Sequence, residues 1–99
     1  MKMTLANQLN FSKNLHLGRY SNGQLAVYIR GFSHEPIAEL SIMEDSIELA
    51  PDEFILKDYS ENEILIQDCY ESNLFSVTQK FVLISSHLCP VCKIKNHWS

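Results

Sequence analysis

The dipeptide Asn22-Gly23 constrains the fold more than any other feature of the sequence, because strand-forming residues lie on both sides of it. Asparagine and glycine tolerate the positive φ angles of a tight hairpin turn. The pair therefore predicts an antiparallel hairpin with strands over residues 14–20 and 24–30. Alternation along the second strand places Leu25, Val27 and Ile29 on one face, which we expect to be buried.

Patterns further along the chain predict an α+β domain. Apolar alternation predicts a third strand over 37–43, with Leu40 and Ile42 facing the core, and further strands over 54–57, 75–78 and 80–88. Ser60 and Glu63 have the spacing of a capping box, and apolar residues at helical spacing follow, so we expect a helix over about 61–71. The predicted architecture is an antiparallel sheet of about five strands with one helix packed on a face.

Length and composition bound the class of protein. A chain of 99 residues is the size of one domain, and we expect a single domain over 1–99 with its core at about 14–88 and a tail at 89–99. A hydrophobic content of 45% and a charged content of 20% argue against intrinsic disorder. The apolar runs are too short for a membrane span or a signal peptide, and three cysteines fit a reducing compartment. We therefore expect a cytoplasmic protein.

The net charge of −4 conceals a strong asymmetry along the chain. All 12 acidic residues lie between Glu35 and Glu71, where Lys57 is the one basic residue, so this window carries −11 and the rest carries +7. If the fold keeps these segments apart, the molecule has an acidic and a basic surface. The acidic window is interpreted either as a solvated face or as a surface that docks on a basic nucleic-acid groove of another protein. The candidate partner-binding residues are Glu44, Asp45, Glu48, Asp52, Glu53, Asp58, Glu61 and Glu63.

Three segments combine turns, strand cores and a helix start: Arg19–Val27 around the Asn-Gly turn, Glu35–Ile42, and Glu53–Glu63. Together they resemble a family of small uncharacterised α+β domains carried by bacterial plasmids, conjugative elements and phages. The likeness covers roughly residues 14–85 and concerns turns, strand cores and the helix start, so no catalytic residue carries over. The resemblance implies a mobile-element accessory protein, and small proteins of that kind often block host defence such as CRISPR nucleases and restriction enzymes.

The C-terminal segment contains the one pattern typical of a metal site. Cys89 and Cys92 have C-x-x-C spacing, His97 is a candidate third zinc ligand, and His87 or Cys69 could add another. Alternatives are an ordinary mobile tail without metal and, with less support, redox chemistry or an intermolecular disulfide. Too little chain follows Cys92 for the helix that lowers a thiol pKa in thioredoxin-like sites.

Other function classes have less support. No nucleophile elbow, phosphate-binding glycine loop or His-Glu-x-x-His motif is present, so we do not expect an enzyme. A pI near 5.4 argues against direct nucleic-acid binding. Residues 80–88 are apolar on both faces, which a water-facing edge strand would avoid, so a homodimer through that strand is a further hypothesis. The alternative is a homodimer through the uncovered sheet face with Tyr20, Tyr28 and Phe32.

The leading hypothesis is a non-enzymatic inhibitor of a host nucleic-acid-targeting defence complex. In it, the protein places its acidic surface where DNA or RNA would bind on a host protein or ribonucleoprotein. The alternative is a small zinc-stabilised adaptor with no inhibitory role.

Overall fold

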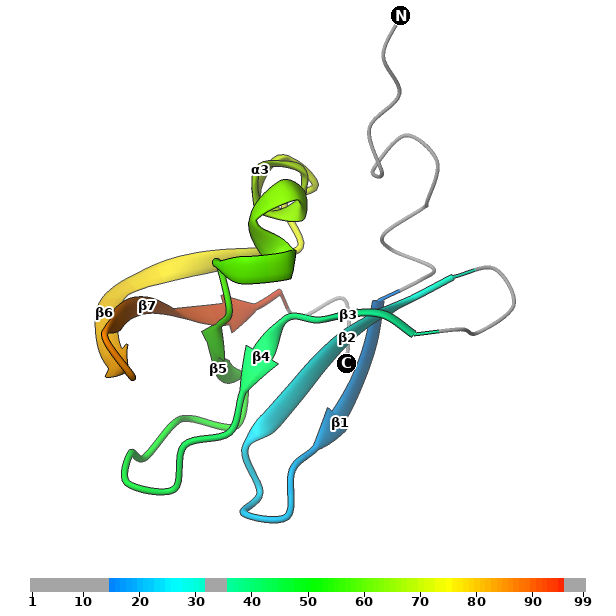
Figure 1. Ribbon diagram of the computed structural model, residues 1–99. Coiled ribbons are helices and arrows are strands. Elements are labelled where there is room, and N and C mark those ends of the chain that lie inside the picture. Colours follow the sequence, from blue (N-terminus) through cyan, green and yellow to red (C-terminus); the bar gives the residue numbers. More distant parts are fainter. Residues whose placement is uncertain (1–14, 32–35, 96–99) are drawn as a thin grey trace, which may run out of the picture.

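The computed structural model describes residues 15–31 and 36–95, which form seven strands, a 3-10 turn and a helix (Figure 1). In chain order these elements are β1 (Leu15–Arg19), β2 (Leu25–Arg30), β3 (Pro36–Glu39), β4 (Ser41–Ile42), β5 (Glu53–Leu56), η1 (Ser60–Asn62), α3 (Glu63–Glu71), β6 (Phe75–Ile84) and β7 (His87–Ile94).

The predicted hairpin is confirmed. β1 and β2 pair antiparallel, with Leu17 opposite Val27. The Gly23 N–H donates to the Tyr20 carbonyl and the Tyr20 N–H donates to the Gln24 carbonyl, both at 2.9 Å. Gly23 has a φ of 89°, and it is the turn residue that adopts the left-handed conformation. A glycine in this place after a tight turn matches the right-handed twist of the two strands.

The strands form two antiparallel sheets, of order β1-β2-β3 and β4-β5-β7-β6, so the predicted single sheet of about five strands is wrong although the α+β class is correct. The predicted strand over 37–43 divides at Leu40, where the chain passes from the first sheet to the second. The Leu40 N–H donates to the Val27 carbonyl at 2.8 Å, and the Lys57 N–H donates to the Leu40 carbonyl at 2.7 Å. The backbone of this one buried residue therefore bonds to both sides of the fold, which lets the apolar alternation continue through the change of sheet.

Helix α3 confirms the predicted helix and corrects its start. Leu65 and Cys69 are buried in the core, as the apolar stripe predicted. The predicted capping box is wrong, because neither η1 nor α3 has a side-chain hydrogen bond at its N-cap. Ser60 has a φ of 58° and opens the 3-10 turn instead. Asn73, with a φ of 62°, follows the helix in the left-handed conformation that commonly ends one.

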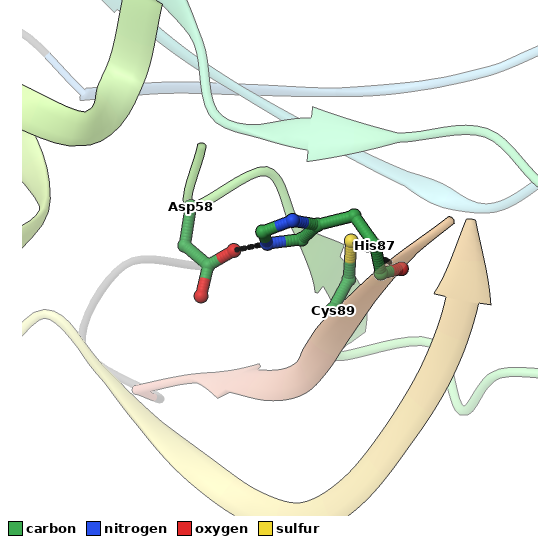
Figure 2. Close-up of side chains that lie close together, drawn as sticks. All are labelled: Asp58, His87 and Cys89. Carbon is green, nitrogen blue, oxygen red and sulfur yellow. Dashed lines mark hydrogen bonds and ion pairs between the residues drawn. The ribbon is translucent and has the colours of Figure 1, made fainter. Parts of the chain in front are cut away.

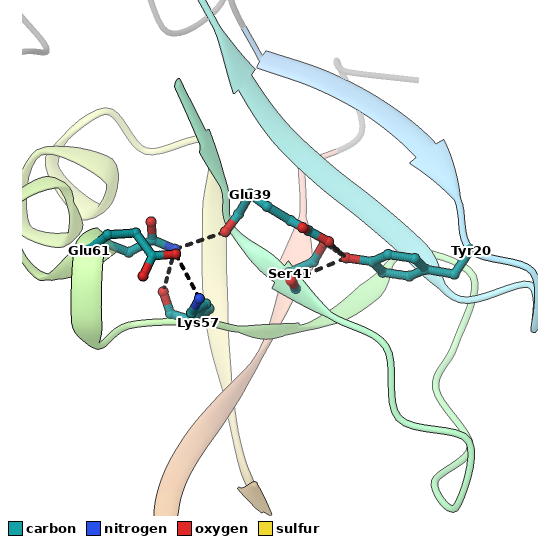
Figure 3. A network of polar contacts seen from close by, with 6 residues as sticks. Tyr20, Glu39, Ser41, Lys57 and Glu61 are labelled. Atoms are coloured by element: carbon teal, nitrogen blue, oxygen red, sulfur yellow. Dashed lines mark hydrogen bonds and ion pairs between the residues drawn. The ribbon is translucent and has the colours of Figure 1, made fainter. Parts of the chain in front are cut away.

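Polar side chains join the two sheets near the start of the helix (Figure 3). The Asn62 side chain is fully buried, and its amide donates to the carbonyls of Glu39 and Lys57 at 2.8 and 2.9 Å. The Tyr20 hydroxyl donates to the Glu39 carboxylate and lies 2.8 Å from the Ser41 hydroxyl. Burial and the Glu39 carboxylate raise the pKa of Tyr20 well above its ordinary value, so the hydroxyl keeps its proton and remains a donor.

Residues 89–94 of the predicted tail belong to the second sheet, so the tail prediction is wrong for them. β6 is one strand that contains the predicted strand 75–78 and the first part of the predicted strand 80–88. β7 begins at His87, so the predicted boundary between core and tail, after residue 88, falls inside a strand. Cys89 and Cys92 are both fully buried. Val91 is the first residue of β7 that pairs with β5, so Pro90 lies just outside that pairing. Its missing N–H therefore interrupts no bond to that strand.

Two apolar clusters cover opposite faces of the second sheet. The larger lies between the sheets and the helix and includes Val27, Phe54 and Leu65. The smaller contains Ile55, Cys89 and Val91. Successive residues of β5 face different clusters, since side chains alternate along a strand. The central strands are therefore buried on both faces.

Candidate functional site

Half of the predicted partner-binding acids are paired with basic residues. The pairs are Lys93–Asp52 at 3.6 Å, Lys80–Glu53 at 2.7 Å, His87–Asp58 at 3.1 Å and Lys57–Glu61 at 2.7 Å. A paired carboxylate offers less net charge to a partner than a free one. The three acids paired with lysine are therefore weaker candidates than the sequence indicated, whereas the histidine beside Asp58 neutralises it only when protonated.

Strand order explains two of the pairs. β7 lies between β5 and β6, so basic residues of the C-terminal segment lie beside acidic residues at the start of β5. Glu53 is opposite Lys93 in the register, and its carboxylate accepts from the Ala50 N–H at 2.9 Å. Lys80 and the Ala50 N–H lower the pKa of Glu53, which is only 9% exposed. The two charged segments are therefore not kept apart here, and Glu53 is a structural residue.

The other four predicted acids divide between two places. Glu44, Asp45 and Glu48 lie in the loop between β4 and β5, and Glu63 begins α3. None of these four forms an ion pair within the described parts of the chain. We call residues 44–48 the acidic loop.

The hairpin turn holds the acidic loop in place. The Gln24 side chain is almost completely buried, and its amide donates to the carbonyls of Glu44 and Ile47 at 2.8 and 2.9 Å. The Gln24 amide oxygen accepts from the Glu44 N–H at 2.8 Å. The Asn22 amide donates to the Asp45 carboxylate at 2.8 Å. Four hydrogen bonds between the loop and these two residues thus fix it. Sequence reasoning missed this role, because the pattern accounts for Asn22 by the turn and for Gln24 by the strand that follows it.

A shallow hollow lies between the hairpin turn and the acidic loop. Asp45 and Glu48 line it, and none of its other lining residues is basic. The full lining is Asn22, Gly23, Gln24, Asp45, Ile47, Glu48 and Leu49. Two carboxylates beside Ile47 and Leu49 match a side chain that has an apolar stem and a cationic head, such as lysine or arginine.

The predicted zinc pair Cys89 and Cys92 is not brought together. Residues three apart in a strand point to opposite faces, and the two thiols belong to different core clusters. Burial raises the pKa of the Cys92 and Cys69 thiols to about 12. This is the opposite of what a redox-active thiol needs. His97 lies outside the described residues.

A different set of donors converges at the beginning of β7 (Figure 2). Asp58, His87 and Cys89 have ligand atoms that all lie within 4.8 Å of one another. In the described residues this is the one group of three or more such donors. The sequence pattern places Asp58 in the acidic surface. The His-x-Cys spacing of His87 and Cys89 becomes informative only when residues 87–94 are recognised as a strand.

The chain was compared with protein-family models, curated proteins and solved structures, and none of them matches it. The family resemblance stated above therefore remains a prediction. Within the described ranges, neither helical element has the length and apolar character that a bilayer span requires.

Proposed function

We propose that the protein is a non-enzymatic binding protein whose acidic loop receives a basic side chain of a partner protein. The observation that carries this proposal is the hollow in which Asp45 and Glu48 lie with no basic neighbour among the lining residues. Lysine and arginine are the side chains that neutralise two adjacent carboxylates.

Rigidity supports this proposal. The backbone of the acidic loop is fixed by the buried Gln24 side chain, and Asp45 is held by Asn22. A partner that binds a rigid loop loses less conformational entropy than one that must first order it. The carboxylates of Asp45 and Glu48 also attract a basic surface over several ångströms and orient the encounter.

The proposed partner is a protein or ribonucleoprotein with a basic groove for nucleic acid. In this proposal the loop occupies part of that groove and excludes DNA or RNA, without binding nucleic acid itself. The resemblance to a mobile-element family favours a host defence complex, such as a CRISPR effector or a restriction enzyme, as the carrier of the groove.

Charge reversal tests the proposal. Asp45→Lys with Glu48→Lys should weaken binding to a purified defence complex about 30-fold, since removing one side of a desolvated ion pair costs about 2 kcal/mol or more. Binding is measured by interferometry at several salt concentrations, and inhibition by transformation with a plasmid that the complex targets. The matched control is Glu63→Lys with Glu71→Lys, which makes the same change of charge on α3.

If the loop and helix variants lose binding equally, net charge alone would explain the effect and the hollow would have no special role. If the wild-type protein inhibits none of a panel of CRISPR and restriction complexes, the assignment to host defence would be wrong.

We further propose that a second copy of the chain packs against β6. β6 is at an edge of its sheet, and three large apolar side chains of the β6–β7 hairpin are exposed: Phe81 (54%), Leu83 (69%) and Leu88 (58%). Leu83 and Leu88 are direct cross-strand neighbours. Exposed apolar surface on an unpaired edge is typical of a contact site.

The charge pattern favours a second copy over a different partner. Residues 81–88 include no Asp, Glu, Lys or Arg, and the nearby Lys80 is neutralised by Glu53. A two-fold contact brings residues close to their own copies, so an isologous surface has to avoid like charges. This segment meets that condition.

A further inference from the structure

Strand geometry explains why His87 and Cys89 lie side by side. They are two apart in β7, so their side chains project from the same face. β7 pairs with β5, and Asp58 follows the end of β5 by two residues, which brings its carboxylate to that face. The His87 Nε2 atom lies 3.1 Å from Asp58 Oδ1, and the Cys89 thiol completes the group within 4.8 Å (Figure 2).

Neighbouring contacts hold the three donors. The Tyr59 ring packs on the His87 imidazole with 4.3 Å between ring centroids. Two hydrogen bonds hold the backbone of Lys57, the residue before Asp58. The Lys57 N–H donates to the Leu40 carbonyl, and the Lys57 carbonyl accepts from the Asn62 amide. Such supporting contacts orient ligands in metal sites. The donors therefore lie on ordered backbone rather than on a loose loop.

The three donor side chains differ in their exposure to solvent. Cys89 is fully buried, whereas the side chains of Asp58 and His87 are 24% and 45% exposed. Among the described residues, the Cys89 thiol donates one weak hydrogen bond, to the His87 carbonyl at 3.8 Å. An ion can thus enter from the solvent side, and water can reach a further coordination position there.

The donor set selects the kind of ion. One thiolate, one imidazole and one carboxylate suit a borderline-soft divalent cation, above all Zn²⁺, whereas Ca²⁺ and Mg²⁺ take oxygen ligands. Zinc bonds of about 2.0–2.3 Å in a tetrahedron place ligands roughly 3.3–3.8 Å apart. Donors within 4.8 Å of one another reach that spacing by small rotations of the partly exposed Asp58 and His87 side chains.

We propose that Asp58, His87 and Cys89 bind one Zn²⁺ ion, with water as the fourth ligand. This site goes beyond the docking function and uses none of the residues that line the hollow. The bound ion joins the first residues of β7 to the segment between β5 and η1. Zinc should therefore raise the thermal stability of the protein, because the unfolded chain does not hold the three ligands together.

Cobalt spectroscopy and zinc analysis test the site on the full chain, purified without a histidine tag. The wild-type protein should retain one equivalent of zinc after dialysis, and Co²⁺ should give a thiolate-to-cobalt charge-transfer band. Asp58→Asn and His87→Gln should each lower zinc affinity by more than about 100-fold, which exceeds the usual effect of losing a supporting contact. Cys89→Ala should also abolish the charge-transfer band.

Cys92→Ala is the matched control, because Cys92 is equally buried but belongs to the other cluster. It should keep both the zinc and the cobalt band. The site is disproved if the wild-type protein retains no more zinc than Asp58→Asn, or if the band is lost in Cys92→Ala and kept in Cys89→Ala. Asp58 and His87 are partly exposed, so their variants decide the question even if Cys89→Ala does not fold.

Discussion

Glu53 shows how a residue that looks like surface charge in the sequence becomes structural. It is almost completely buried, accepts a hydrogen bond from the Ala50 N–H and pairs with Lys80. The Lys80 hydrogen bond is the main reason that its pKa lies below the ordinary value of 4.5. A lowered carboxyl pKa means that the ionised form stabilises the folded state.

The stability that Glu53 contributes should depend on pH. It is fully present above pH 4.5 and is lost as the pH falls through the lower pKa of the folded state. Glu53→Gln should reduce the free energy of unfolding by about 1 kcal/mol at pH 7, since Lys80 is half exposed and the pair is partly screened. The difference from wild type should shrink towards pH 3, as measured by urea denaturation.

Glu48→Gln is the control, because Glu48 is exposed, lies outside both helical elements and forms no ion pair in the described residues. It should change stability little at either pH. An equal loss for Glu53→Gln at pH 7 and pH 3 would contradict a role for its charge and would leave packing as the explanation.

At the scale of elements, β6 carries a bulge that separates its two parts. The register with β7 shifts between Val77 and Phe81, and Gln79 adopts a φ of 73°. The Thr78 hydroxyl donates to the Val91 carbonyl at 2.8 Å, which fixes the bulge on its partner strand. A residue with a Cβ atom is strained by about 1–2 kcal/mol in this left-handed conformation.

Glycine at position 79 should therefore stabilise the protein. Gln79→Gly relieves the strain but adds freedom to the unfolded chain, so the expected net gain is about 0.5–1 kcal/mol. Ser76→Gly, in the regular part of the same strand, should instead destabilise by a similar amount. Thermal unfolding of both variants measures the contrast. A loss of stability in both would show that the bulge stores no strain.

Two elements with a local signal were predicted correctly from the sequence, although the capping box, also a local signal, was not. The Asn22-Gly23 turn and the apolar stripe of α3 depend on residues within a few positions, and both are found where expected. The change of sheet at Leu40 was not predictable in this way, because it depends on hydrogen bonds to Val27 and Lys57, which lie 13 and 17 residues away. A continuous apolar alternation carries no mark of such a change.

The C-terminal strand was missed for a different reason. Pro90 normally argues against a paired strand, and the Ser85-Ser86 turn lacks the glycine or asparagine that marks a hairpin. If residues 87–94 are taken as an unstructured tail, Cys89 and Cys92 are interpreted as one chelating pair. With β7, the alternation of side chains separates them and brings His87 beside Cys89 instead. The residue types of the proposed zinc site are thus visible in the sequence, whereas which of them lie together is clear only once residues 87–94 are known to form a strand.

At the scale of the whole molecule, the two proposed contact surfaces differ in character. The hollow by the acidic loop is charged and suits a basic partner, whereas the β6 edge is apolar and suits a second copy. Tests of the two are independent, because reversing Asp45 and Glu48 leaves the apolar face unchanged. A dimer would also present two acidic loops at once, and two linked contacts strengthen binding to a partner that offers two basic sites.

The dimer prediction rests on Leu83, which is 69% exposed on the edge strand. In size-exclusion chromatography with light scattering, the wild-type protein should elute with the mass of two chains. Leu83→Lys should be a monomer, because a two-fold contact would bring two buried lysines close together. Ile64→Lys is the matched control, since Ile64 is 85% exposed on α3 and its substitution adds the same charge to a different face. That variant should remain a dimer. A wild-type monomer at high concentration would leave Phe81, Leu83 and Leu88 as a surface for a different, apolar partner.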